Sequence, residues 1–224
     1  MDADTALRLA KKLQISRDYV VREEFEALLL KEIFESSFGS SLIFKGGTAL
    51  RLAFNSPRFS EDLDFDQIKK INKEKFEKFI DSVKVKYPEI VRIETMDKYF
   101  TLLVLIKIKV EYLNKVFSIK LEISKRPNDL KKNKDYSDKV IKTEVSPLTV
   151  LVPVASLEMI LRGKADALKN RKAARDVFDY WYINQLLKKE IKVDFSSFDK
   201  VSVRSELHKL LAKPYWKLVD SWLD

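Results

Sequence analysis

The sequence contains no cysteine, one histidine and only four glycines among its 224 residues. Without cysteine the chain can form neither disulfides nor cysteine-based zinc sites, which agrees with a cytoplasmic location. It also lacks an apolar run of about 18 residues, the length that a membrane-spanning helix needs. Residues 1–14 are charged and amphipathic and have no apolar centre of the kind found in signal peptides. We therefore expect a cytoplasmic protein that has no membrane partner.

Several familiar active-site patterns are absent as well. The single histidine, His208, has no neighbours that suggest a catalytic triad, and we interpret it as a surface or packing residue. The three tryptophans lie at helical spacings, which is more typical of a core than of a base-stacking platform. The chain has no Walker P-loop, no GxGxxG and no HExxH motif. Any nucleotide site must therefore be built in another way.

Positive charge is abundant: 43 Lys and Arg residues against 34 Asp and Glu residues leave a net charge of +9. With 46% hydrophobic residues, the composition is that of a globular protein. A basic surface attracts polyanions such as nucleic acid, nucleotides or anionic lipid. Lysine-rich surfaces also occur for solubility alone, so charge by itself leaves both interpretations open.

Apolar periodicity predicts the order of the elements. Helices are expected over residues 5–13, 18–36, 49–54 and 73–84, and short strands over residues 40–44 and 63–65. Three extended segments follow, over residues 90–94, 99–111 and 115–123, and the last two predict an antiparallel hairpin. The polar residues 124–142 are expected to form an exposed loop. One long helix is expected from Ser156 to Leu187, and further helical segments over residues 205–211 and 216–223.

This order predicts an α+β fold in two parts. The strands lie in the first two-thirds of the chain, and the final third is helical. We expect a lobe over residues 1–150, with a small mixed sheet, flanking helices and the N-terminal helices. A helical lobe over residues 151–224 would complete a cleft with it.

Two of the four glycines, Gly46 and Gly47, stand together between a predicted strand and a predicted helix. Glycine allows backbone N–H groups to approach a ligand closely, and a helix N-terminus adds positive potential, so this position suits a phosphate. The alternative is a tight turn that needs a positive φ.

Asp62 and Asp64 follow Thr48 by fourteen and sixteen residues. Residues i and i+2 of a strand point to one face, so the two carboxylates would lie side by side and repel each other unless a divalent cation binds them. An exposed edge strand with solvated acids is the alternative. Glu122, on a neighbouring strand, is the candidate third ligand; the alternative is an outward-facing residue beside Lys120.

The predicted long helix carries a second group of charges. Lys164, Arg171, Arg175 and Asp179 have spacings i, i+7, i+11 and i+15, which place them on one stripe of a continuous helix. Such a stripe could form a cleft wall in which cations hold a triphosphate and Asp179 orients them. The alternative is a helix surface with ion pairs such as Arg175–Asp179.

These motifs resemble a known family. The stretches Phe44-Lys-Gly-Gly-Thr-Ala-Leu-Arg-Leu and Arg58-Phe-Ser-Glu-Asp-Leu-Asp-Phe are similar to the signature of the AbiEii/AbiGii-type nucleotidyltransferase toxins, of the DNA polymerase β-like superfamily. The order of Lys164, Arg171, Arg175-Asp176 and Asp179 is similar to their later motif. The resemblance covers about residues 40–183.

The resemblance implies a nucleotidyltransferase-like sheet lobe and a helical lobe with an NTP between them. It implies that Asp62 and Asp64, with Glu122 as the candidate third acid, hold Mg²⁺ or Mn²⁺. It implies Asp62, Asp64, Lys164 and Asp179 as catalytic residues. The candidate nucleotide contacts are Lys45, Gly46, Gly47, Thr48, Arg51, Lys164, Arg171 and Arg175.

The function implied is Mg²⁺-dependent transfer of NMP from an NTP to an acceptor, with tRNA the expected acceptor and a cognate antitoxin the expected partner protein. Two other functions stay open at this point. One is nucleotidyl transfer to a small molecule or to protein. The other is a catalytically silent regulator that binds nucleic acid through its charge.

Overall fold

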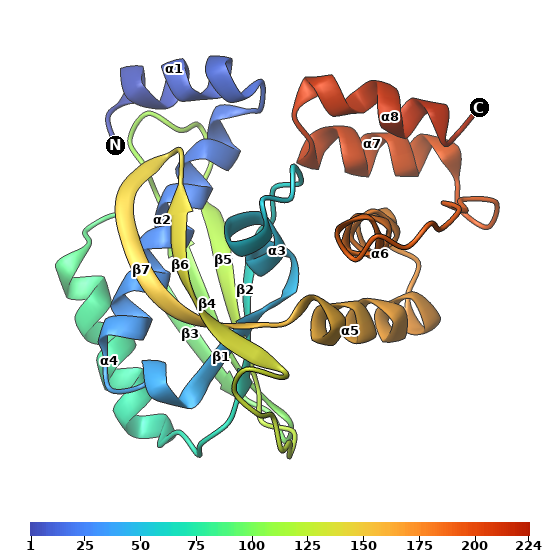
Figure 1. The fold of residues 1–224 in the computed structure, drawn as a ribbon. Helices are drawn as coiled ribbons and strands as arrows, with labels where there is room; N and C mark the ends of the chain where they lie inside the picture. The colour runs from blue at the N-terminus through green and yellow to red at the C-terminus, as the bar shows by residue number, and fades with distance from the viewer.

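The computed structural model describes residues 1–224, which form one mixed sheet and eight α-helices (Figure 1). The helices are α1 (Ala3–Leu13), α2 (Arg17–Glu35), α3 (Gly46–Phe54), α4 (Lys73–Lys86), α5 (Leu157–Asn170), α6 (Ala174–Leu186), α7 (Lys200–Leu210) and α8 (Trp216–Ser221). The strands are β1 (Leu42–Lys45), β2 (Asp62–Gln67), β3 (Ile90–Asp97), β4 (Thr101–Ile108), β5 (Phe117–Ser124), β6 (Tyr136–Thr143) and β7 (Ser146–Ala155). Short 3₁₀ turns occur at Gly39–Ser41 (η1) and Lys213–Tyr215 (η2). None of the helices combines the length and the apolar character needed to cross a membrane.

The sheet has seven strands in the order β3-β4-β5-β2-β1-β7-β6. β4 and β5 pair antiparallel, which confirms the predicted hairpin. β2 lies between β1, to which it is antiparallel, and β5, to which it is parallel. The predicted α+β class with a mixed sheet is therefore confirmed. The two short strands that flank the glycine pair in sequence, β1 and β2, lie inside the sheet.

The prediction of an exposed loop over residues 124–142 is wrong for its second half, which forms β6 and pairs antiparallel with β7. β6 is one of the two edge strands of the sheet, and Ile141 is its only buried residue. A strand exposed in this way keeps polar side chains, so its composition resembles that of a loop. β7 runs through the predicted lobe boundary at 150–151 and ends at Ala155, while the division into two lobes stays a prediction.

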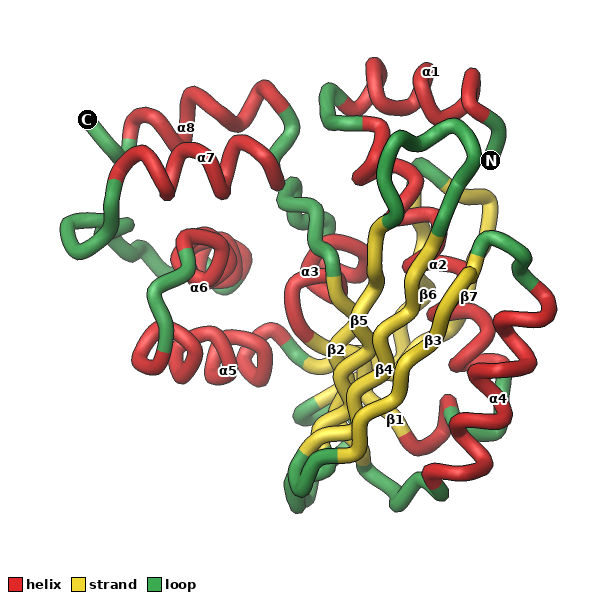
Figure 2. The backbone as a smooth tube through the Cα atoms, turned by 180° about the vertical axis from the view of Figure 1, so that it is seen from behind, coloured by secondary structure: helices red, strands yellow, loops and turns green.

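The larger hydrophobic core lies between the sheet and the helices α2 and α4. It contains 34 buried residues, among them Phe25 and Leu29 of α2, Phe76 of α4, and Leu63 and Ile119 of the sheet. Helix α2 has apolar residues at successive turns and packs against the sheet, as Figure 2 shows from behind. This core fixes the sheet that carries Asp62 and Asp64.

A smaller core of eight buried residues holds α6, α7 and α8 together. Phe178 of α6 stands at its centre, with Trp181 and Trp222 packed against it at ring-centroid distances of 5.6 and 6.0 Å. Trp181 and Trp222 therefore serve packing, as predicted. Both views show α5–α8 as a group beside the sheet, with α3 between them and the strands (Figures 1 and 2).

Candidate active site

The candidate site begins where β1 ends and α3 starts. Gly46 has a φ of +83°, a left-handed conformation that strains any residue with a Cβ. A Cβ on Gly46 would overlap the carboxylate of Asp64, and a Cβ on Gly47 would overlap the guanidinium of Arg58 and the hydroxyl of Ser60. The two glycines therefore serve both a positive-φ turn and the close approach of β2. No side chain caps the first turn of α3, so its N–H groups are available to an anion.

Asp62 and Asp64 point to the same face of β2. The burial of β2 alternates: Leu63 and Phe65 are fully buried, and the two aspartates are half-buried. Asp64 is paired with Lys45 of β1 on one side and with Glu122 of β5 on the other. This arrangement places three carboxylates on adjacent strands.

The electrostatics of Asp64 reflect this crowding. Burial raises the pKa of Asp64 to about 6, and the negative charges of Asp62 and Glu122 add to the rise. The positive charges of Lys164 and Lys120 oppose it. Lys164 belongs to α5, one of the C-terminal helices that lie beside the sheet (Figures 1 and 2). A carboxylate of this kind gains stability when a cation binds beside it.

Lys120 lies between two of the acids. Its Nζ is 3.3 Å from Asp62 Oδ2 and 3.3 Å from Glu122 Oε2. No three Asp, Glu or His side chains are placed to hold a metal ion together. The donor set nevertheless suits a hard divalent cation, because it consists of carboxylate oxygens on one face beside an uncapped helix N-terminus. Asp62 and Asp64 are the residues that would hold such an ion. For Glu122 to join them, Lys120 would have to release it.

The single long helix predicted from Ser156 to Leu187 is wrong. Helix α5 begins at the N-cap Ser156 but ends at Asn170, and α6 begins at Ala174. A carboxylate from α7 caps the start of α6, since Glu206 Oε2 accepts a hydrogen bond of 2.9 Å from Ala174 N. The predicted single stripe is therefore divided between two helices.

Lys164 and Asp179 nevertheless come together across that break. Lys164 Nζ lies 2.9 Å from Asp176 Oδ1 and 2.6 Å from Asp179 Oδ2. Arg171 donates from its Nε to Asp176 Oδ2 at 2.8 Å. Asp176 and Asp179 are fully buried, so four charges form one network at the junction of α5 and α6.

The network reaches the segment before β2 through Arg58. Its Nε and Nη2 donate to the two oxygens of Asp179 at 2.6 and 2.7 Å, and its side chain is almost completely buried. Burial alone would raise the pKa of Asp179, but the charges and hydrogen bonds of Arg58 and Lys164 outweigh it and lower that pKa. Because Arg58 also touches Gly47, one ion pair connects the start of α3 to α6.

Three other predicted contacts have protein partners in the structure. Lys45 Nζ lies 2.7 Å from Asp66 Oδ1. Arg51 Nε lies 2.8 Å from Glu23 Oε2, and Arg175 Nη1 lies 3.2 Å from Glu206 Oε1. The hydroxyl of Thr48 donates to the backbone oxygen of Asp62, which ties α3 to β2. The assignment of these four residues to the nucleotide stays a prediction.

Sequence reasoning assigned no role to Arg58, Asp176 or Glu26. Arg58 opens the second motif, and Asp176 stands between two residues of the later motif, so adjacency was the available signal. Glu26 of α2 is buried with one oxygen unpaired, and burial raises its pKa well above the usual value. Nothing in its helical sequence distinguishes Glu26 from a solvent-facing glutamate.

Comparisons with known proteins agree with this geometry. Residues 28–201 match the family model described as nucleotidyl transferase AbiEii toxin, type IV toxin–antitoxin system. The crystal structure of JHP933 from Helicobacter pylori is similar, with 25% identity, a TM-score of 0.62, and coverage of 93% of this chain and 90% of that one. A structure from H. pylori assigned as a nucleotidyltransferase has 24% identity, a TM-score of 0.61, and coverage of 93% and 92%.

No curated protein matches the chain. The family model, however, spans more than three-quarters of the sequence and includes the glycine pair, Asp62, Asp64, Lys164 and Asp179. The protein is therefore a nucleotidyltransferase and belongs to the AbiEii toxin family of type IV toxin–antitoxin systems.

Proposed function

We propose that this nucleotidyltransferase transfers a nucleoside monophosphate from an NTP to a hydroxyl of RNA, with tRNA as the acceptor and a cognate antitoxin as its partner protein. One observation carries the proposal: the uncapped start of α3 lies directly against Asp64, with Asp62 on the same face of β2. An anion site and a cation site side by side suit the triphosphate of a nucleotide together with its metal ion.

The reaction is an in-line displacement at the α-phosphorus. The acceptor oxygen forms a new bond to that phosphorus, the bond to the oxygen that bridges the α- and β-phosphates breaks, and pyrophosphate leaves. The proton of the acceptor hydroxyl passes to solvent or to a carboxylate of the site. Positioning and charge stabilisation supply the acceleration in such a reaction.

Residues on two sides of the proposed site would carry out these tasks: α3 and β2 on one side, and α5 on the other. N–H groups at the start of α3 would receive phosphate oxygens, and Gly46 and Gly47 keep that approach free of side chains. Asp62 and Asp64 would hold Mg²⁺ or Mn²⁺, which when bound would neutralise charge on the phosphates. Opposite them, Lys164 contributes a cation whose position Asp176 and Asp179 fix.

Replacing Asp62 with asparagine tests the proposal directly. We expect transfer of label from α-labelled NTPs to total RNA, in the presence of Mg²⁺, to fall at least about 100-fold in Asp62→Asn, because one anionic ligand is lost. Thermal unfolding should show little loss of stability, since the exchange also removes repulsion between neighbouring carboxylates.

Asp81→Asn is the matched control. Asp81 is an exposed aspartate of α4 without an ion pair, so the same chemical change should leave transfer within about twofold of the wild type. Absence of label on RNA with the folded wild type, or equal transfer by both variants, would refute the proposal. Label on protein or on a small molecule would assign a different acceptor.

A further inference from the structure

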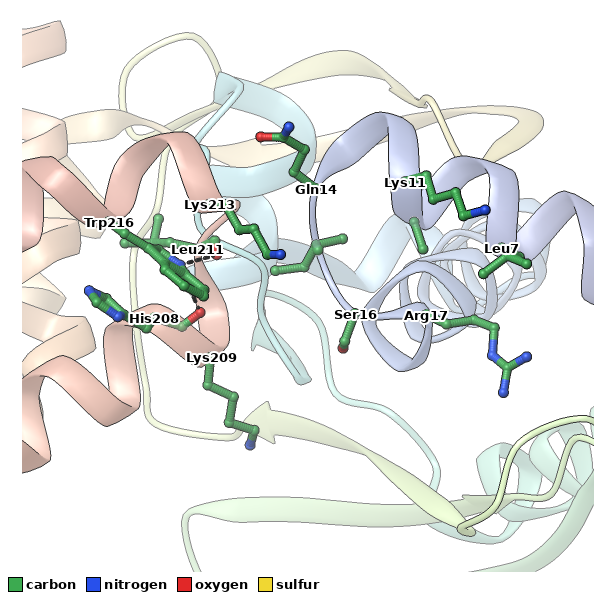
Figure 3. Close-up of a pocket in the computed structure, with 12 residues that line it drawn as sticks. Leu7, Lys11, Gln14, Ser16, Arg17, His208, Lys209, Leu211, Lys213 and Trp216 are labelled. Atoms are coloured by element: carbon green, nitrogen blue, oxygen red, sulfur yellow. Dashed lines mark hydrogen bonds between the residues drawn. The ribbon is translucent and has the colours of Figure 1, made fainter.

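A groove lies between two segments that are far apart in the sequence, the end of α1 and the turn that joins α7 to α8. Its volume is about 670 Å³, and residues 7–17 and 208–216 supply all of its lining (Figure 3). The lining combines an apolar floor, including Ala10, Ile15 and Leu211, with a cationic rim. The predicted active site contributes no residue to it.

The rim is positively charged, and of its four cations only Lys209 is paired with a carboxylate, that of Glu61. Lys11, Arg17, Lys209 and Lys213 line the groove, whereas no aspartate or glutamate does. Lys11 and Lys213 are exposed and make no ion pair with the protein, although many other lysines of this chain do. Unpaired cations that line one groove favour an anionic occupant, because a bound anion reduces the repulsion between them.

An aromatic pair forms part of the same groove. Trp216 and His208 stack with ring centroids 4.5 Å apart and an interplanar angle of 2°. The indole Nε1 donates to the backbone oxygens of His208 and Leu211, which fixes the orientation of the ring. Asp220 is 3.2 Å from His208 Nε2 but does not line the groove. A fixed aromatic surface beside lysines is the combination on which bases of single-stranded nucleic acid stack.

The groove is connected to the strand that carries Asp62. Lys209 Nζ lies 3.1 Å from Glu61 Oε1, and Glu61 directly precedes Asp62. Leu210 O accepts a hydrogen bond of 2.8 Å from Phe59 N, so the end of α7 is fastened to the segment that leads into β2. A strand lying in the groove would pass Lys209 on its way towards the carboxylates.

We propose that this groove docks the sugar-phosphate backbone of the acceptor RNA, with the His208–Trp216 pair as a stacking surface for a base. The proposal rests on the proposed function in taking RNA as the acceptor. Lys11 and Lys213 contact phosphates and leave the chemistry to the site on β2. An acidic protein partner is the competing occupant, but an acidic peptide would make no use of the stacked rings.

The test is a charge reversal in the groove, Lys11→Glu with Lys213→Glu, compared with Lys78→Glu and Lys84→Glu on α4. All four lysines are exposed and unpaired, so both double variants carry the same net charge. Binding of a labelled RNA hairpin with a single-stranded 3′ end is measured without NTP over a range of salt. We expect the groove variant to bind at least about tenfold more weakly, with a salt slope smaller by about 2, and the α4 variant to bind within about twofold of the wild type.

Protection of lysines from acetylation provides a measurement on the unaltered protein. RNA should protect Lys11 and Lys213 and leave Lys78 and Lys84 reactive. Equal loss of binding in the two double variants, or no protection of the groove lysines, would overturn the proposal. An acidic protein would then be the favoured occupant of the groove.

Failure of the proposed function would have a different signature. If the wild type transfers nucleotide to RNA but the groove variant binds RNA as well as the wild type, only the role of the groove in RNA binding is refuted. If the wild type transfers no label to RNA but the groove variant binds RNA more weakly than the wild type, the proposed transfer reaction is refuted and the groove remains supported as an RNA-binding site.

Discussion

Asp179 shows how one buried residue can depend on partners from two other parts of the chain. Its two oxygens receive Arg58 from the segment before β2, and Lys164 of α5 approaches the same carboxylate. A buried carboxylate without such partners would be neutral or would destabilise the fold. Asp179 therefore acts as a positioning residue, which fixes Lys164 and connects α6 to the start of α3.

Asp179→Asn should lower the free energy of unfolding by about 3–5 kcal/mol at neutral pH, because it leaves Arg58 buried with an uncompensated charge. Urea unfolding measures the loss. Asp166→Asn is the matched control on α5: this aspartate is exposed and pairs only with Lys169, so its loss should cost less than about 0.5 kcal/mol. Equal effects of the two changes would contradict the positioning role.

The same pair predicts a pH dependence. The pKa of Asp179 is lowered on folding, so its contribution is present above the unfolded value of about 3.9 and is lost as the pH falls through the folded pKa. The difference in stability between wild type and Asp179→Asn should therefore be constant near pH 7 and shrink below about pH 4. A difference that stays constant into acid would show that Asp179 is not ionised in the folded protein.

At the scale of elements, the start of α3 explains why two of the four glycines of the chain stand side by side. Gly46 needs its positive φ, and both Gly46 and Gly47 face side chains that a Cβ would displace. The strand–turn–helix order was predictable because an apolar run of strand length, residues 40–44, precedes the glycine pair and a helical pattern, residues 49–54, follows it. The break between α5 and α6 was not, since residues 171–173 contain good helix formers and the cap of α6 comes from Glu206, about thirty residues later.

Gly46→Ala should lower the free energy of unfolding by about 1–3 kcal/mol and strongly reduce nucleotide transfer, because the Cβ strains the turn and displaces Asp64. Gly163→Ala makes the same change in the middle of α5, where a Cβ meets nothing within 4 Å. There we expect a gain of about 0.5–1 kcal/mol from helix propensity. Thermal unfolding and the transfer assay distinguish them; a neutral Gly46→Ala would refute the close packing described at the site.

At the scale of the whole molecule, two hydrophobic cores of unequal size stabilise the fold. The cluster built on the sheet, α2 and α4 contains 34 buried residues, including Ile160 of α5 and Ile183 of α6, whereas the core of α6–α8 contains eight. Arg58–Asp179 and the hydrogen bond of 2.9 Å from the Tyr182 hydroxyl to Phe54 O connect the two parts.

Native-state hydrogen exchange should show the difference in size between the two cores as a difference in amide protection. We expect the amides of α7 and α8 to exchange at least about tenfold faster than those of β4 and β5, because less apolar surface is lost when the C-terminal helices open. Asp179→Asn should increase the difference, since it removes a connection between the parts. Equal protection of the helices and the strands would indicate a single cooperative unit.

The sequence by itself determined the α+β class, the glycine turn before α3 and the shared face of Asp62 and Asp64, because helical and strand periodicity and backbone sterics act over a few residues. Only the tertiary structure decided that Lys120 lies between Asp62 and Glu122, that α5 and α6 are separate, and that Arg58 meets Asp179. Each of these depends on a partner from another part of the chain. The energies of these contacts come from burial and ion pairing between segments distant in the sequence, and such interactions produce no local sequence pattern.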